Sequence, residues 1–94
     1  MATQTPAGGI VVDPLSFSVS DVTGLHVLDL ENVDGHRTVG DVATSIASLM
    51  DLPANIPYAL RDDTRAKMLV DDSPLGNQVD LGAKLVLTPK VHLG

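Results

Sequence analysis

One segment of this chain has the periodicity of an amphipathic helix, and it constrains the fold more than any other feature. Between residues 39 and 52 the apolar positions fall on one helical face: Val39, Val42, Ile46, Leu49 and Met50. Thr38 is the predicted N-cap, with the acidic Asp41 three residues later, and Pro53 is expected to stop the helix. A single helix has one apolar face to bury, so the rest of the chain must form a sheet that covers it.

Two strands are predicted before the helix. Apolar residues alternate with serines from Leu15 to Ser20, and a second alternation runs from His26 to Glu31. The residues between them, 21–24, have the composition of a turn, so the two segments are expected to form a hairpin.

Shorter elements follow the helix. Strands are predicted at 58–61 and 67–70 with a turn at 62–64, and residues 75–79 fit one helical turn that places two apolar residues on the core. The apolar run of a closing strand at 84–88 indicates a central position, parallel to the first strand. This order of elements predicts an α+β fold of the β-grasp type, in which a mixed sheet of four to five strands wraps over one helix.

The chain is expected to hold one small domain and two flanking segments. Residues 1–9 offer almost nothing to bury and predict a disordered leader, and residues 10–88 form the domain. Pro89 is expected to end strand pairing, which leaves 89–94 as an extended tail.

Composition excludes several classes of function. Twelve acidic and six basic residues give a formal charge of −6, which argues against nucleic acid or a membrane as partner and favours a protein with a basic surface. The chain has no cysteine, no signal-peptide pattern and no apolar stretch that could cross a bilayer, so we expect a cytoplasmic protein.

No catalytic or metal site is expected. His26, His36 and His92 are scattered along the chain, and without cysteine they predict neither a metal site nor another cofactor. The aspartate pairs at 62–63 and 71–72 are interpreted as solvated turn residues, because no nucleophile or base accompanies them. We therefore do not expect an enzyme.

Several residues have the types and spacings of a known family. The turn Val22-Thr23-Gly24 and the helix start Thr38-Val39 have family counterparts, and so do further residues at similar spacings: Val42, Ile46, Lys67, Leu69, Leu75, Val79, Leu85 and Leu87. From about Leu15 to Gly94 the chain resembles ubiquitin and its relatives, and in particular a bacterial ubiquitin-like modifier. In that resemblance Gly94 coincides with the final glycine of the mature modifier.

The resemblance implies a protein modifier. The Gly94 carboxylate would be adenylated with ATP by a dedicated activating enzyme, passed to a conjugating enzyme and joined to target proteins through an isopeptide bond, which a deconjugating protease could remove. Tail recognition would fall to Lys90, Val91, His92 and Leu93. The chain's three lysines, Lys67, Lys84 and Lys90, are the candidate acceptors for self-conjugation.

Two departures keep alternatives open. Leu93 stands where the first of two terminal glycines would be, which favours a dedicated partner enzyme. Arg61 and Thr88 replace apolar residues of ubiquitin's recognition surface and leave Val22, so that surface is expected to be largely lost. A non-covalent ubiquitin-fold adaptor of a secretion or regulatory complex is one alternative, and a sulfur carrier is another.

Overall fold

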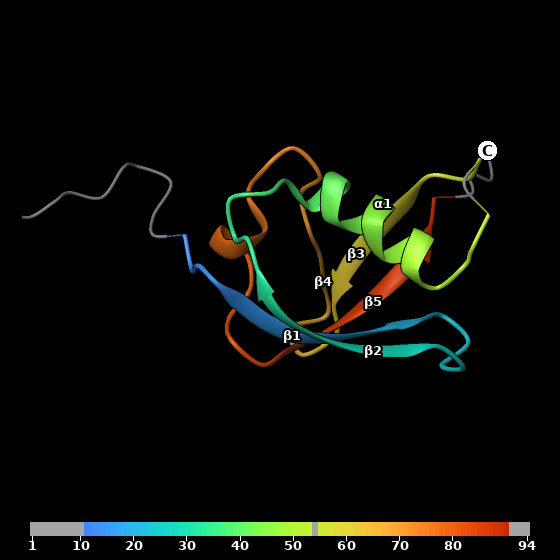
Figure 1. Ribbon diagram of the computed structural model, residues 1–94, viewed down its shortest axis with the longest axis horizontal. Coiled ribbons are helices and arrows are strands. Elements are labelled where there is room, and N and C mark those ends of the chain that lie inside the picture. The colour runs from blue at the N-terminus through green and yellow to red at the C-terminus, as the bar shows by residue number, and fades with distance from the viewer. Residues whose placement is uncertain (1–10, 54, 91–94) are drawn as a thin grey trace, which may run out of the picture.

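The computed structural model describes residues 11–53 and 55–90 and contains one helix, one 3₁₀ turn and five strands in that part of the chain (Figure 1). The predicted leader at 1–9 lies outside these residues. The strands are β1 (Leu15–Asp21), β2 (Val27–Val33), β3 (Tyr58–Asp62), β4 (Lys67–Met68) and β5 (Ala83–Pro89). The helix α1 spans Val39–Leu49, and the 3₁₀ turn η1 spans Leu75–Asn77.

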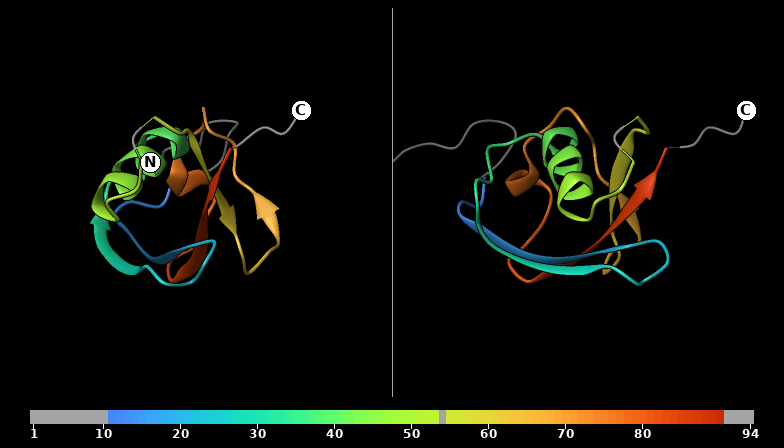
Figure 2. Two further views of the ribbon diagram at one scale, coloured as in Figure 1. Left: turned by 90° about the vertical axis from the view of Figure 1, so that its right-hand side faces the viewer. Right: turned by 45° about the vertical axis from the view of Figure 1, so that its right-hand side comes forward.

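The five strands form one mixed sheet in the order β2-β1-β5-β3-β4. β1 pairs antiparallel with β2 and parallel with β5, while β3 pairs antiparallel with both β5 and β4. The curved sheet wraps around α1, which lies across its concave face (Figure 2). The structure thus confirms the β-grasp prediction, including the hairpin and the central closing strand parallel to the first.

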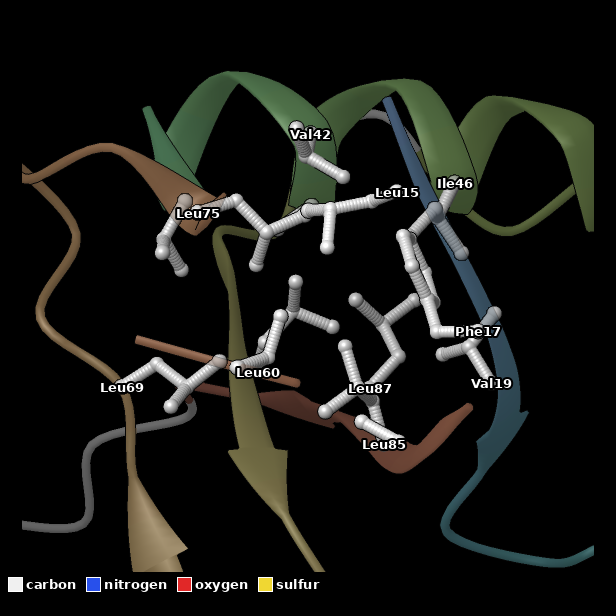
Figure 3. Close-up of a cluster of buried hydrophobic side chains, with 14 of the residues drawn as sticks. Leu15, Phe17, Val19, Val42, Ile46, Leu60, Leu69, Leu75, Leu85 and Leu87 are labelled. Atoms are coloured by element: carbon white, nitrogen blue, oxygen red, sulfur yellow. The ribbon is translucent and has the colours of Figure 1, made fainter. Parts of the chain in front are cut away.

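The core lies between α1 and the inner face of the sheet. Side chains from β1, β3, β5, α1 and the loop around η1 meet there (Figure 3). Six of the large side chains have less than 2% exposure: Leu15, Ile46, Leu60, Leu75, Leu85 and Leu87. Leu75 and Val79 are both buried, as predicted for the helical turn.

The helix begins as predicted but ends early. The Thr38 side chain accepts a hydrogen bond from the Asp41 N–H at 3.2 Å, which confirms the N-cap. Asp51 then adopts a left-handed φ of 58°, and the N–H of Leu52 donates back to the Ala47 carbonyl at 2.9 Å. The N–H of Asp51 also donates to the Ser48 carbonyl, at 3.0 Å. The two bonds form a Schellman motif, so the helix stops at Leu49 rather than near residue 52.

The prediction is also wrong for one residue of the apolar stripe. Leu49 is 64% exposed, whereas Ala43 and Ala47 are buried beside Val42 and Ile46. Since an α-helix advances 100° per residue, Leu49 falls at the margin of the stripe, and the small alanines let α1 approach the sheet closely.

The prediction of a strand at 67–70 is too long. Beyond β4, the Leu69 N–H still donates to the Leu60 carbonyl at 2.9 Å. At Val70 the side-chain amide of Gln78 takes over both backbone groups, accepting from the N–H at 2.7 Å and donating to the carbonyl at 3.0 Å. A side chain therefore replaces the next strand partner, and the pairing ends.

Asp62 is not a solvated turn residue. It is the last residue of β3, its exposure is 2%, and its carboxylate accepts the N–H groups of Thr64 and Arg65 at 3.0 and 3.3 Å. The carboxylate is buried because it holds together the turn that follows the strand.

Pro89 does not end strand pairing. β5 includes Pro89, which lies opposite Tyr58, and the N–H of Lys90 donates to the Pro57 carbonyl at 2.8 Å. Successive N–H groups of a strand point to opposite sides, so the missing N–H of Pro89 faces the β1 side. β1 has already ended there, since its last residue, Asp21, lies opposite Leu87. Within residues 11–53 and 55–90, no helix is long and apolar enough to cross a membrane.

Candidate functional site

The candidate site is the place where β5 leaves the sheet and leads into the tail. Leu85 and Leu87 point into the core and are 2% and 1% exposed. β5 pairs with β1 on one side and with β3 on the other, so it is fixed along both edges. The tail therefore starts from a strand that is held by the sheet and by the core.

Lys90 is the last described residue, and two contacts hold it. Its N–H donates to the Pro57 carbonyl, as described above, and its ammonium forms an ion pair with the Asp71 carboxylate. Pro57 precedes β3 and Asp71 follows β4, so one residue links the end of β5 to both flanking loops. Val91, His92, Leu93 and Gly94 lie outside the described residues.

A groove of about 610 Å³ lies beside this point, between the second half of α1 and residues 52–53 and 55–58. Ala47, Leu52 and Ile56 contribute apolar walls, and Tyr58 lies at the β3 end. The Tyr58 hydroxyl donates to the Pro53 carbonyl at 3.3 Å, which links the start of β3 to the residues that follow α1. Its neighbour Pro57, which anchors Lys90, also lines this groove, so a partner that reads the tail would meet both features.

Lys90 lies apart from the other two candidate acceptor lysines. Lys67 is exposed on the edge strand β4, opposite Asp62, and Lys84 is exposed near the start of β5. Lys90 lies at the other end of the same strand, roughly 20 Å away at 3.3 Å per residue. Only Lys90 forms an ion pair among the described residues, so its amine is engaged while the other two face solvent.

The outer face of the sheet places Arg61 beside apolar residues that the sequence did not single out. Arg61 lies on β3 between Val86 of β5 and Met68 of β4, and its guanidinium pairs with Asp63 at 2.6 Å. Val86 lies opposite Ser20 of β1, and Ser20 lies opposite Val27 of β2, so these residues form one row across the sheet. Val27 is 61% exposed. Arg61 thus lies between two apolar residues of the outer face, Val86 and Met68.

Strand register explains why these residues were missed. Val27, Val86 and Met68 come from three segments far apart in the chain, and only the order β2-β1-β5-β3-β4 brings them into one row. In the sequence these residues alternate with core residues, which predicts that they lie on the outer face of the sheet. The alternation does not predict which residues of other strands lie beside them. Of the predicted surface residues, Val22 is 59% exposed, and Thr88 lies beside Ala59 on the outer face.

A hydrogen-bonded group stiffens the β1–β2 turn. The Asp21 carboxylate accepts the Thr23 hydroxyl at 2.8 Å and lies 2.7 Å from Nδ1 of His26. The hydrogen bond from His26, followed by that from Thr23, lowers the pKa of Asp21 well below its ordinary value of 3.8. His26 therefore has a structural contact in the hairpin, at the end of the sheet where Asp21 lies opposite Leu87.

An exposed group of possible metal ligands lies at the opposite end of the domain. Asp13, Asp34 and His36 offer ligand atoms within 4.8 Å of one another. Asp13 already accepts the Gly35 N–H at 3.0 Å, and Asp34 accepts the His36 N–H at 2.8 Å. The latter bond, first among the causes, lowers the pKa of Asp34. These contacts explain the cluster as a loop closure.

Comparison with known proteins identifies a related fold. Searches of family models and of curated proteins find no match for this chain. Among solved structures, the chain is similar to the ubiquitin of Caldiarchaeum subterraneum, with 27% sequence identity and a TM-score of 0.65. The similarity covers 85% of this chain and 98% of that ubiquitin, so nearly the whole archaeal domain has a counterpart here.

Proposed function

We propose that this chain, which is a ubiquitin-like protein of the β-grasp fold, is a protein modifier that is attached to targets through the carboxylate of Gly94. The proposal applies to Gly94 as the carboxyl end that reacts, whether that end is encoded directly or released from a longer precursor. A dedicated ATP-dependent activating enzyme, a conjugating enzyme and the target proteins are its partners.

One observation carries the proposal. The chain matches 98% of an archaeal ubiquitin, and its central strand β5 delivers the chain to Lys90, four residues before Gly94. A short segment that follows a strand paired along both edges suits insertion into an enzyme's active site, because the residue from which the segment starts is already held in place.

In the proposed conjugation reaction the domain supplies only the carboxylate. The Gly94 carboxylate would attack the α-phosphate of ATP and release pyrophosphate, which gives an acyl adenylate. A thiolate of the enzyme would then displace AMP to form a thioester, and a target amine would displace the thiolate to form the isopeptide bond. This chain has no cysteine, so the thiolates belong to its partners.

The departures from ubiquitin support a dedicated set of partners. Leu93 puts a bulky side chain next to the reacting glycine, so the enzyme channel must be wider there. On the outer face, the charged Arg61 stands between Val86 and Met68. A reader with an apolar surface would have to desolvate this guanidinium together with its ion-pair partner Asp63, which is costly.

The test is adenylation by a candidate ATP-dependent activating enzyme from the same organism. The full chain, the enzyme, ATP and Mg²⁺ should give pyrophosphate exchange that depends on the chain, and a covalent product whose mass shows loss of one water. A chain lacking Gly94 should lose both signals, and Lys84→Gln should keep the exchange. Exchange that persists at full rate without Gly94 refutes the proposal.

An adaptor role has one observation in its favour. Leu25 at the tip of the β1–β2 hairpin is 82% exposed, and Val22 and Val27 beside it are 59% and 61% exposed. Exposed apolar groups of this kind mark contact surfaces in many proteins. In the adaptor case a chain that ends at Lys90 should retain its partner, and Leu25→Ser should lose it.

The sulfur-carrier alternative can be tested on this protein directly. Intact mass spectrometry of protein from its native host would show about 16 mass units more when sulfur replaces a carboxylate oxygen. The modifier proposal expects no such species.

A further inference from the structure

Lys90 differs from the other two lysines because both its backbone and its side chain are engaged. The backbone bond to Pro57 continues the pairing of β5 with β3 by one residue, and the ammonium reaches across to Asp71 beyond β4. The side chains of Lys90 and Asp71 are 42% and 32% exposed, so water screens the pair only in part.

Asp71 is itself firmly placed. Its carbonyl oxygen accepts the Gly40 N–H at 3.0 Å, in the first turn of α1. One carboxylate oxygen, Oδ1, is buried and has no hydrogen-bond partner among the described residues. The Lys90 ammonium on Oδ2 is therefore the group that compensates this half-buried charge.

We propose that the Lys90–Asp71 ion pair is a latch that keeps the end of β5 paired to Pro57 and so fixes the point from which the tail reaches the activating enzyme. Lys90 is then a positioning residue for Gly94 and not an acceptor lysine. The positioning of Gly94 for the activating enzyme rests on the proposed modifier function. The ion pair and its effect on strand pairing do not, because they can be measured on the isolated chain.

The expected effects are modest and measurable. The last paired residue of a strand opens easily, so its closed and open states differ little in free energy. Losing a partly exposed ion pair should raise the open population about two- to five-fold. An enzyme that binds only the closed arrangement would show an apparent KM raised by the factor by which the closed fraction falls, which is smaller than the change in the open population.

The first experiment measures hydrogen exchange of the Lys90 amide by NMR in the full chain. Lys90→Gln and Asp71→Asn should each speed its exchange about two- to five-fold, whereas Lys90→Arg should preserve the wild-type rate. Lys84→Gln is the matched control, since it removes an exposed lysine of the same strand. The exchanged pair Lys90→Asp with Asp71→Lys should restore protection.

Salt supplies an independent readout. At about 1 M NaCl the wild-type Lys90 amide should exchange as fast as that of Lys90→Gln, because the Debye length falls to about 3 Å. A Lys90 amide that exchanges at the same rate in wild type, Lys90→Gln and Asp71→Asn overturns the latch.

The second experiment measures adenylation kinetics with the same variants. Lys90→Gln and Asp71→Asn should raise the KM for the chain by less than about five-fold, in proportion to the fall in the closed fraction, and leave kcat unchanged. Lys90→Arg should match wild type. Equal KM values for active wild type and variants overturn the positioning role while the modifier function stands. No adenylation of wild type overturns both, and the exchange data still decide whether the latch exists.

Discussion

Replacing Leu87 by alanine should nearly unfold this domain, whereas the same change at its neighbour Val86 should be tolerated. Leu87 lies on the central strand, is 1% exposed and points into the core opposite Leu60 (Figure 3). Val86 belongs to the same strand but faces outward beside Ser20 and Arg61, and it is only half-buried. The pair therefore isolates burial from strand position.

The magnitude follows from the two environments. A buried leucine that becomes alanine loses its transfer free energy and leaves a cavity, together about 2.7–5 kcal/mol. Domains of this size are stable by only about 5–15 kcal/mol, so Leu87→Ala removes a large share. Val86→Ala loses part of one half-exposed side chain and should cost about 1 kcal/mol or less.

Urea unfolding followed by circular dichroism checks both values. With a slope of about 1 kcal/mol per molar urea, Leu87→Ala should lower the midpoint by about 3–5 M or leave no folded baseline. Val86→Ala should lower it by about 1 M or less. Equal losses for the two variants would refute the assignment of inner and outer faces on β5.

Three further predictions follow from particular residues. Asp51→Gly should stabilise the domain by up to about 1 kcal/mol, seen as a rise in Tm, because glycine adopts the φ of 58° at the helix end without strain; a lower Tm would contradict the Schellman closure. Gly35→Ala should cost about 1–3 kcal/mol in urea unfolding, since its Cβ would lie 1.8 Å from the Val12 carbonyl oxygen, whereas wild-type stability would show that this contact relaxes. The pKa of Asp21 is lower in the folded state, so its contribution to stability is present above pH 3.8 and is lost as pH falls below that value; Asp21→Asn should flatten the dependence of unfolding free energy on pH below 4, and an unchanged slope would exclude this carboxylate as the source.

The elements that the sequence predicted are those with a local signal. The alternation in β1 and the Thr38 cap each depend on residues within a few positions of one another, and both were confirmed. The central place of β5 also followed, because an apolar closing strand has few other ways to bury itself. These features require only periodicity and one layer of packing.

The features that the sequence missed depend on distant partners. The Gln78 amide ends the pairing at Val70, eight residues earlier in the chain, and Lys90 meets Asp71 across nineteen residues. Asp62 was assigned to solvent because aspartates favour turns, and it is buried for the same reason, since its carboxylate holds the turn from inside. Side-chain contacts to loop backbones leave no periodicity in the sequence.

Strand register connects the core to the start of the tail. A slip of β5 by one residue would turn Leu85 and Leu87 to solvent, so the core fixes the register. The same register sets Lys90 opposite Pro57 and within reach of Asp71. The point from which the tail starts is therefore determined by leucines buried in the core. The ion pair at Lys90 needs to contribute only the last small part of the free energy that holds the strand end closed.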